Sequence, residues 1–241
     1  MKTFSRCLTK MALFSMTLLL MPFFSGTMSS FAQDASNPVE GGGVNVDGWM
    51  GAVDARESGR GLTINDAIFQ STDDGIHMKT GPSSTYWSKD SMTEGSFTVM
   101  ATFTEPEYMS LSDHPHPSGL IIGGKDMGSE NQTFVYCMAY GNGKFLVRGF
   151  SPEPFRLNGD HQETHEAVNT AAGEGEPVTQ AIAISVTEST VSCTINGTEV
   201  WSRPKSEVVG EGLLSSTDGY VGLRVGHNAE STVSGFHVMV N

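Results

Sequence analysis

The chain has 241 residues, with 14 lysines and arginines against 27 aspartates and glutamates, so its formal net charge at pH 7 is −13. Such an acidic surface repels nucleic acid and anionic lipid, and it favours neutral or cationic ligands or metal ions. The alternative is that the charge only keeps the protein soluble in a salty or extracellular setting. The length is sufficient for one large β domain with its own hydrophobic core.

The first 32 residues are typical of a secretory signal peptide. Basic residues at positions 2, 6 and 10 precede an apolar run over residues 11–24, and Ser30-Phe31-Ala32 offers a small-x-small cleavage site. We therefore expect export to the periplasm or the extracellular space, with an uncleaved membrane anchor as the alternative. Cleavage would remove the three basic residues and leave 11 against 27 acidic ones, a net charge of −16. We expect no membrane partner for the mature form.

The rest of the chain is typical of a β protein. Residues 33–46 are polar and glycine-rich without periodicity, which predicts a flexible leader before a single domain over residues 47–241. We expect about twelve strands and one short helix near residues 163–172. The expected strands lie at residues 67–70, 76–79, 85–88, 96–103, 118–124, 133–150, 181–201, 219–225 and 234–240. Two packed antiparallel sheets explain this pattern, so the prediction is an all-β jelly-roll sandwich.

The run over residues 133–150 has a hairpin signal at Asn142-Gly143, a pair that suits a two-residue type I′ turn. This turn would place Tyr140 opposite Phe145, and paired residues share a face of the sheet. The predicted core face then carries Phe134, Tyr136, Met138, Tyr140, Phe145 and Val147. The predicted opposite face is mixed and groove-like, with Val135, Cys137, Ala139, Lys144, Leu146, Arg148 and Phe150.

A second unit of three strands spans residues 181–201, with turns at Glu188-Ser189 and Asn196-Gly197. This register predicts one apolar face that includes Ile184, Cys193 and Val200, and it places Trp201 on the other face. Cys193 thus lies on an apolar face, whereas Cys137 lies on the mixed face of its hairpin. The two faces argue against a disulfide between these cysteines, although export would permit one.

Several segments together resemble the concanavalin A-like lectin/glucanase superfamily: SFTVMATF, SGLIIGG, YGNGKFLVRGF, VSCTINGTEVW and GYVGLRVGHNAESTVSGFHVMV. The order of these segments is similar to laminin-G-like and 3-keto-disaccharide hydrolase-type domains and covers roughly residues 61–241. The resemblance implies a concanavalin A-like sandwich and a glycan-related role, but not one activity, since this fold hosts lectins, hydrolases and structural modules. The glucanase pattern Glu-x-Asp-x-x-Glu is absent from the sequence, which disfavours its two-carboxylate chemistry.

Four histidines fall in two loops that flank the strands between residues 118 and 150. His114 and His116 form a His-x-His pair, and His161 and His165 follow in the second loop. With Asp160, these side chains are candidate ligands for zinc or another divalent ion. A hydrolase would use His114, His116 or His161, or a metal-bound water, as the base, and Arg148 to stabilise developing oxygen charge. The alternative is two solvated polar loops.

Sugar sites combine aromatic platforms with planar polar groups, and the candidate ligand-binding residues are Tyr86, Trp87, Arg148 and Trp201. Tyr86 and Trp87 point to opposite faces of their strand, so only one of them can line a groove. Asp126 and Asn131 offer oxygen ligands for calcium. We expect a protein that binds carbohydrate. A hydrolase of a modified disaccharide or glycoside, and a non-catalytic surface interaction module, are the alternatives.

Overall fold

The computed structural model describes residues 35–240. The expected signal peptide, residues 1–32, lies outside the described residues. No helix within residues 35–240 is long and apolar enough to cross a membrane.

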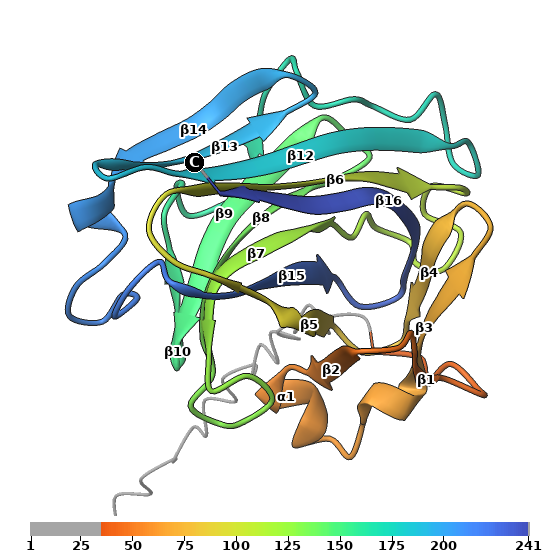
Figure 1. The fold of residues 1–241 in the computed structure, drawn as a ribbon. Helices are drawn as coiled ribbons and strands as arrows, with labels where there is room; N and C mark the ends of the chain where they lie inside the picture. The colour runs from red at the N-terminus through yellow and green to blue at the C-terminus, as the bar shows by residue number, and fades with distance from the viewer. Residues whose placement is uncertain (1–34, 241) are drawn as a thin grey trace, which may run out of the picture. The chain divides into compact units, whose positions relative to one another are not determined.

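Two sheets of eight strands each make up the structure, and β12, β6 and β16 of the first sheet run side by side in Figure 1. We call the first sheet 'sheet A'. Its strands form because apolar residues alternate with polar ones along them. In β6, for example, the alternate residues Phe97, Val99, Ala101 and Phe103 are buried, as predicted. In spatial order sheet A contains β1 (Gly43–Asn45), β3 (Ala67–Thr72), β4 (Gly75–Thr80), β16 (Ala229–Val240), β6 (Phe97–Glu105), β12 (Val178–Val186), β13 (Thr190–Ile195) and β14 (Thr198–Pro204).

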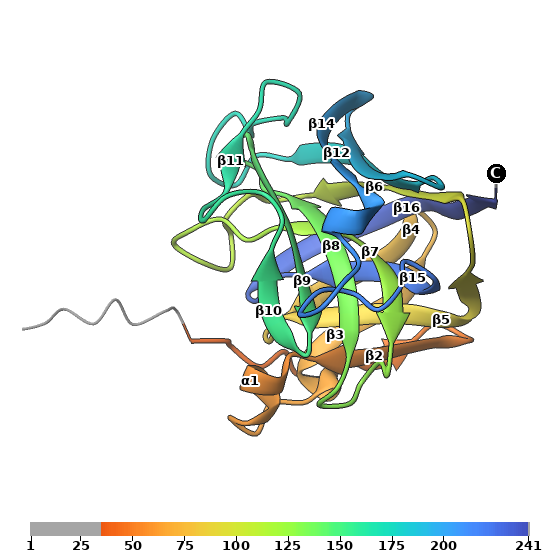
Figure 2. The same cartoon turned by 90° about the vertical axis from the view of Figure 1, so that its left-hand side faces the viewer.

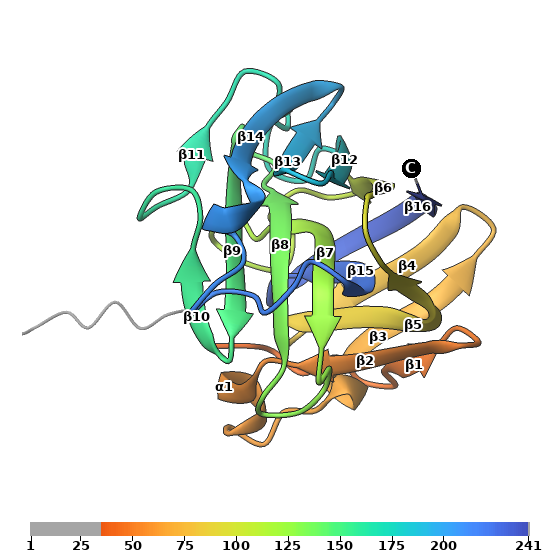
Figure 3. The same ribbon diagram turned by 60° about the vertical axis from the view of Figure 1, so that its left-hand side comes forward.

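Sheet B lies across the core from sheet A, and Figure 3 shows three of its strands, β9, β8 and β7, running side by side. Within the described residues, the pairing of β1 with β3 is parallel and all other strand pairings are antiparallel. In spatial order sheet B contains β10 (Glu153–Arg156), β9 (Lys144–Ser151), β8 (Thr133–Ala139), β7 (Ser118–Lys125), β15 (Gly219–Val225), β5 (Ser84–Thr93) and β2 (Trp49–Val53), with β11 (Glu163–Thr164) paired to β9.

Helical structure is confined to three short elements among the described residues. The α-helix α1 (Ala55–Ser58) follows β2 directly (Figure 2), and 3-10 turns lie at Ile64–Asp66 and Lys205–Glu207. The prediction of a helix near residues 163–172 is wrong, because this segment contains β11 followed by turns. The Ala167 amide donates to Nδ1 of His165, and the Asn169 side chain donates to the Thr179 carbonyl. These contacts hold the segment in an irregular path.

The core lies between the two sheets and draws apolar side chains from both. Val99, Ile182 and Val191 of sheet A and Leu120, Val147 and Leu223 of sheet B belong to one buried cluster. The predicted all-β sandwich of two antiparallel sheets is therefore confirmed. Part of the expected leader takes part in it, since β1 pairs with β3 and the Asn37 amide donates to Oδ1 of Asn228 at 2.8 Å.

The predicted register of the hairpin formed by β8 and β9 is wrong by one residue. Ala139 pairs with Phe145 and Cys137 with Val147, and the Tyr140 amide donates to the Lys144 carbonyl. Three residues therefore connect the strands instead of two. A slip of one residue sends one strand's side chains to the opposite face. In the structure Val135, Cys137, Ala139, Phe145 and Val147 face the core, whereas Phe134, Tyr136, Met138, Tyr140 and Leu146 form a separate cluster.

The corrected register also overturns the argument against a disulfide. Cys137 on β8 and Cys193 on β13 both face the core and are bonded to each other, with their Cα atoms 6.4 Å apart. This bond links sheet B to sheet A.

Trp201 illustrates a second effect of register. The predicted turn at Asn196-Gly197 is confirmed, and Ile195 pairs with Thr198. A bulge then follows, so that Cys193 pairs with Trp201 instead of Val200. The Trp201 side chain consequently enters the core, where its indole Nε1 donates to the Leu157 carbonyl at 3.1 Å.

Candidate functional sites

Sheet B carries a second apolar cluster on the side that points away from sheet A. Alternation along β8 and β9 directs these residues opposite to the core residues of the same strands. We call this side the aromatic face; it carries the buried residues Ile121, Phe134, Tyr136, Met138, Tyr140 and Leu146, with Met127 and Phe150 packed against them. This cluster makes the outer side of sheet B a candidate binding surface, because its rings lie outside the main core, although each is at most 8% exposed.

Arg224 of β15 anchors this face. Its guanidinium forms a two-pronged ion pair with Asp54, with Nη1 to Oδ1 at 2.8 Å and Nη2 to Oδ2 at 2.6 Å, and Nη1 also donates to Thr85. It also lies over the ring of Tyr136, 4.8 Å from the ring centre. Burial lowers the pKa of Arg224, but Asp54 and Tyr136 together outweigh this effect and the net pKa is raised. The arginine therefore stays charged and fixes the rings around it.

Arg148 lies on the same face, on β9 opposite Tyr136. Its Nη2 donates to the carbonyl of Asp160 at 3.4 Å, while its Nε is buried and has no hydrogen-bond acceptor among residues 35–240. Burial raises the pKa of both Tyr136 and Tyr140, and the nearby charge of Arg148 opposes this rise. Both phenols therefore keep their protons at neutral pH and remain hydrogen-bond donors.

The other candidate sugar-binding residues divide between the faces of sheet B. Tyr86 stacks on Phe69 in the core at 4.2 Å between ring centres, and Trp201 lies in the core as well. Trp87 points to the aromatic face, where a Cβ atom at Gly128 would lie 3.4 Å from its ring. Trp87 and Arg148 are thus the two sequence candidates that the structure brings to one face.

Three histidines gather at one end of the sandwich. One ring nitrogen from each of His114, His116 and His227 lies within 4.8 Å of the others, a grouping that could hold a metal ion. The ring centres of His116 and His227 are 3.9 Å apart, and those of His114 and His116 are 4.5 Å apart. His227 is buried, whereas the His114 side chain is 45% exposed.

The pairing of β7 with β15 explains this grouping. Ser118 pairs with Val225 at the ends of the two strands. Continuing the same antiparallel register by two residues places His116 opposite His227. The Gly226 amide donates to the Pro117 carbonyl at 2.8 Å, so the two segments remain in contact beyond the strands. A side chain at position 226 would meet the Cβ of His116 at 3.2 Å, which is why glycine allows the close approach.

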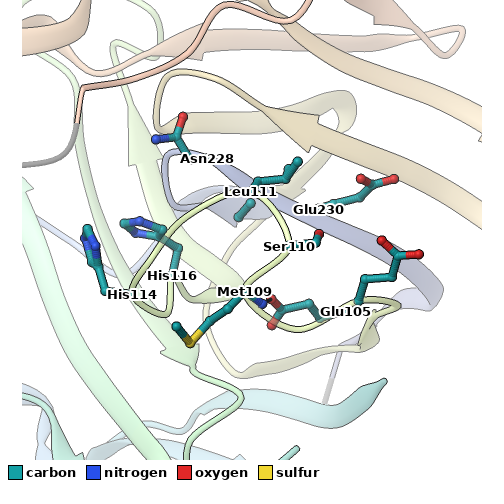
Figure 4. A pocket seen from close by; sticks show the side chains of 10 residues that line it. Glu105, Met109, Ser110, Leu111, His114, His116, Asn228 and Glu230 are labelled. Atoms are coloured by element: carbon teal, nitrogen blue, oxygen red, sulfur yellow. Dashed lines mark hydrogen bonds between the residues drawn. The ribbon is translucent and has the colours of Figure 1, made fainter. Parts of the chain in front are cut away.

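A shallow pocket that is open to solvent adjoins the histidines. Figure 4 shows His114 and His116 side by side at one end and Glu105 and Glu230 toward the other. Burial raises the pKa of Glu105 to about 7, although a hydrogen bond from the Met109 amide opposes the rise. Glu230 instead pairs with His77 and Lys79. Glu105 thus has a pKa suited to proton transfer near neutral pH.

The remaining metal candidates lie elsewhere among the described residues. His165 packs edge-on against Phe145 beside the turn between β8 and β9. Asp160 accepts from Arg156 at 2.8 Å, and His161 is exposed in the same loop. None of these three belongs to the described histidine group. Asp126 and Asn131, the calcium candidates, are both exposed in the loop between β7 and β8.

Sequence reasoning missed His227, Arg224, Asp54 and Glu105. The motif Gly-His-Asn after the strand at residues 219–225 was a usable signal for His227. It becomes informative only once the pairing of that strand with residues 118–124 is known.

No protein-family model matches this chain, and no curated protein matches it significantly. Many solved structures match this chain, among them the two that follow. A carbohydrate binding module, CBM66, from Bacillus subtilis superimposes with a TM-score of 0.54 at 10% identity, over 82% of this chain and 98% of that one. A protein of unknown function with a galectin-like fold from Bacillus subtilis superimposes with a TM-score of 0.53 at 12% identity, over 80% of this chain and 89% of that one. The chain therefore shares the β-sandwich fold of these two proteins.

Proposed function

We propose that this protein is an exported β-sandwich that binds a glycan on the aromatic face of sheet B. Fold likeness does not carry this proposal, because one fold serves many functions. The observation that carries it is Arg148, which lies opposite Tyr136 in sheet B and whose buried Nε has no acceptor among the described residues. A buried donor without an acceptor is costly. Because Arg148 as a whole is partly exposed, a small shift of its side chain would let a ligand oxygen accept from Nε.

The chemistry of the face suits a sugar. A pyranose ring has an apolar face of C–H groups that packs on aromatic rings, and hydroxyl groups that bind planar polar side chains. Trp87 and Tyr136 supply rings, and Arg148 supplies donors on the same side of sheet B. The net charge of −13 favours a neutral glycan over an acidic one.

The disulfide bond in the core supports export. Disulfides persist in oxidising compartments and are rare in the cytosol. The bond between Cys137 and Cys193 thus agrees with a periplasmic or extracellular location.

Affinity electrophoresis in gels that contain neutral or acidic polysaccharides tests the glycan proposal. We expect a neutral polysaccharide to retard the protein, and Arg148→Ala and Trp87→Ala to remove most of the retardation. Arg203→Ala is the matched control, because Arg203 lies on β14 of sheet A and is also partly exposed. Circular dichroism checks that each variant is folded. Unchanged retardation of Arg148→Ala would remove the aromatic face as the site. No retardation by any polysaccharide would reject glycan binding and favour an interaction module.

A hydrolase of a modified disaccharide or glycoside is the second candidate, and the histidine pocket favours it. Glu105, with its pKa raised to about 7, shares this pocket with His114 and His116. A carboxyl group with such a pKa can donate a proton to a leaving group and accept one from water. Incubation with a panel of glycosides and keto-disaccharides, with chromatography of released sugars, tests this function. Glu105→Gln should abolish any turnover and Glu107→Gln should not, while no turnover by the wild type would reject the candidate.

A further inference from the structure

We propose that His114, His116 and His227 form a binding site for a transition-metal ion of the zinc class. The proposal does not depend on glycan binding at the aromatic face. It rests on the convergence of three imidazoles from two segments far apart in the sequence. One segment leads into β7 and the other leaves β15, at the end where these two strands pair.

The spacing of the ring nitrogens suits an ion after a small closure. They lie within 4.8 Å of one another. A tetrahedral zinc ion with bonds of about 2.0–2.1 Å needs its nitrogen ligands roughly 3.4 Å apart. The rings must therefore approach by at most about 1.4 Å. The exposed side chain of His114 can supply this movement, because it projects from a loop, whereas His227 is fixed in a buried position.

Neighbouring oxygens already orient two of the rings. Oδ1 of Asp113 lies 2.8 Å from Nδ1 of His114, the kind of carboxylate contact that holds metal-binding histidines in position. The hydroxyl of Ser112 lies 3.4 Å from Nδ1 of His114 and 3.2 Å from Nε2 of His116. The serine thus brings an oxygen atom between two of the three proposed ligands.

The ligand type selects the class of metal. Imidazole binds zinc, cobalt, nickel and copper, whereas calcium and magnesium require oxygen ligands. The acidic chain attracts cations in general, and the adjoining pocket adds Glu105, Glu107 and Glu230. Three protein ligands leave at least one coordination position for an oxygen from Ser112, from water or from a bound molecule.

Cobalt titration of the purified protein, prepared without a histidine tag and stripped with a chelator, tests the site. Cobalt in a nitrogen-rich tetrahedral site absorbs visible light, so the readout does not depend on any activity. We expect one equivalent of cobalt per chain, displacement by zinc, and a rise in melting temperature with zinc. No visible band and no thermal shift would overturn the proposal.

Single variants locate the ion. His114→Ala and His116→Ala should each weaken cobalt binding at least tenfold, and Asp113→Asn should weaken it by about tenfold. His161→Ala is the matched control, because His161 is another loop histidine outside the group, and it should bind cobalt like the wild type. His227→Ala should also lose binding, but its buried position makes the two loop variants the firmer test. Equal loss in His161→Ala, or no loss in the loop variants, would show that cobalt binds elsewhere.

Discussion

Cys137 of β8 and Cys193 of β13 form a bond that crosses the sandwich and joins its two sheets. The two cysteines are 56 residues apart, so the bond closes a loop that contains β9 to β12. Closing such a loop limits the conformations of the unfolded chain and thereby stabilises the folded state.

Replacing both cysteines by alanine should therefore lower the free energy of unfolding by about 2–4 kcal/mol. Urea unfolding, followed by tryptophan fluorescence, measures this change. Reductant should lower the unfolding midpoint of the wild type but leave that of the double variant unchanged. Equal midpoints for the oxidised wild type and the double variant would show that the bond contributes no stability.

The ion pair between Arg224 and Asp54 should be important for stability, because both partners are largely shielded from water. The side chains are 7% and 19% exposed, respectively. Arg224→Met would leave the Asp54 carboxylate without its partner, and we expect a loss of about 3–5 kcal/mol in the free energy of unfolding. Chemical denaturation measures the loss.

The exposed pair of Arg156 and Asp160 provides the matched control, with side chains 54% and 84% exposed. Arg156→Met should cost about 0–1 kcal/mol, since solvent screens such pairs. Similar losses in the two methionine variants would contradict a special role for the buried pair.

Glu105 should make the protein less stable as the pH rises toward neutrality. Its pKa is about 7 in the folded state because of burial, against 4.5 for an unperturbed carboxyl group. Below pH 4.5 both states are protonated. Between pH 4.5 and about 7 the unfolded state loses the proton first, so the free energy of unfolding falls, and above pH 7 the fall is complete.

Glu105→Gln should remove this fall, so the variant should gain melting temperature over the wild type at pH 8 and not at pH 4. Scanning calorimetry at both pH values measures the difference. Glu107→Gln, two residues away at the same pocket, controls for the general loss of negative charge. An identical gain in both glutamine variants would indicate a general charge effect.

Strand positions could be predicted because alternation is a local property of the sequence. Ile182, Ile184 and Val186 pair with Ile195, Cys193 and Val191 as expected. The hairpin of β8 and β9 could not be predicted from its turn residues alone. Asn196 and Gly197 both have positive φ, at 50° and 84°, as a type I′ turn requires. In the other Asn-Gly pair, Gly143 has a positive φ but Asn142 does not.

Long-range contacts explain this difference between identical dipeptides. Asn142 bridges to Thr170, and the Ala171 amide donates to the Gly141 carbonyl. The chain that packs on the turn thus selects a three-residue connection. Dependence on long-range contacts limits the prediction of sites in the same way. His116 is recognisable in the sequence as part of a His-x-His motif, but its proximity to His227 follows only from the pairing of the distant strands β7 and β15.

The position of His116 opposite His227 has a consequence for local opening of the sandwich. An ion held by both histidines would connect the first residues of β7 to the last residues of β15. Fraying of this strand pair would then require release of the ion. The amide hydrogens of Gly119 and Arg224 should consequently exchange with solvent more slowly when metal is bound, while those of β13 and β14 keep their rates.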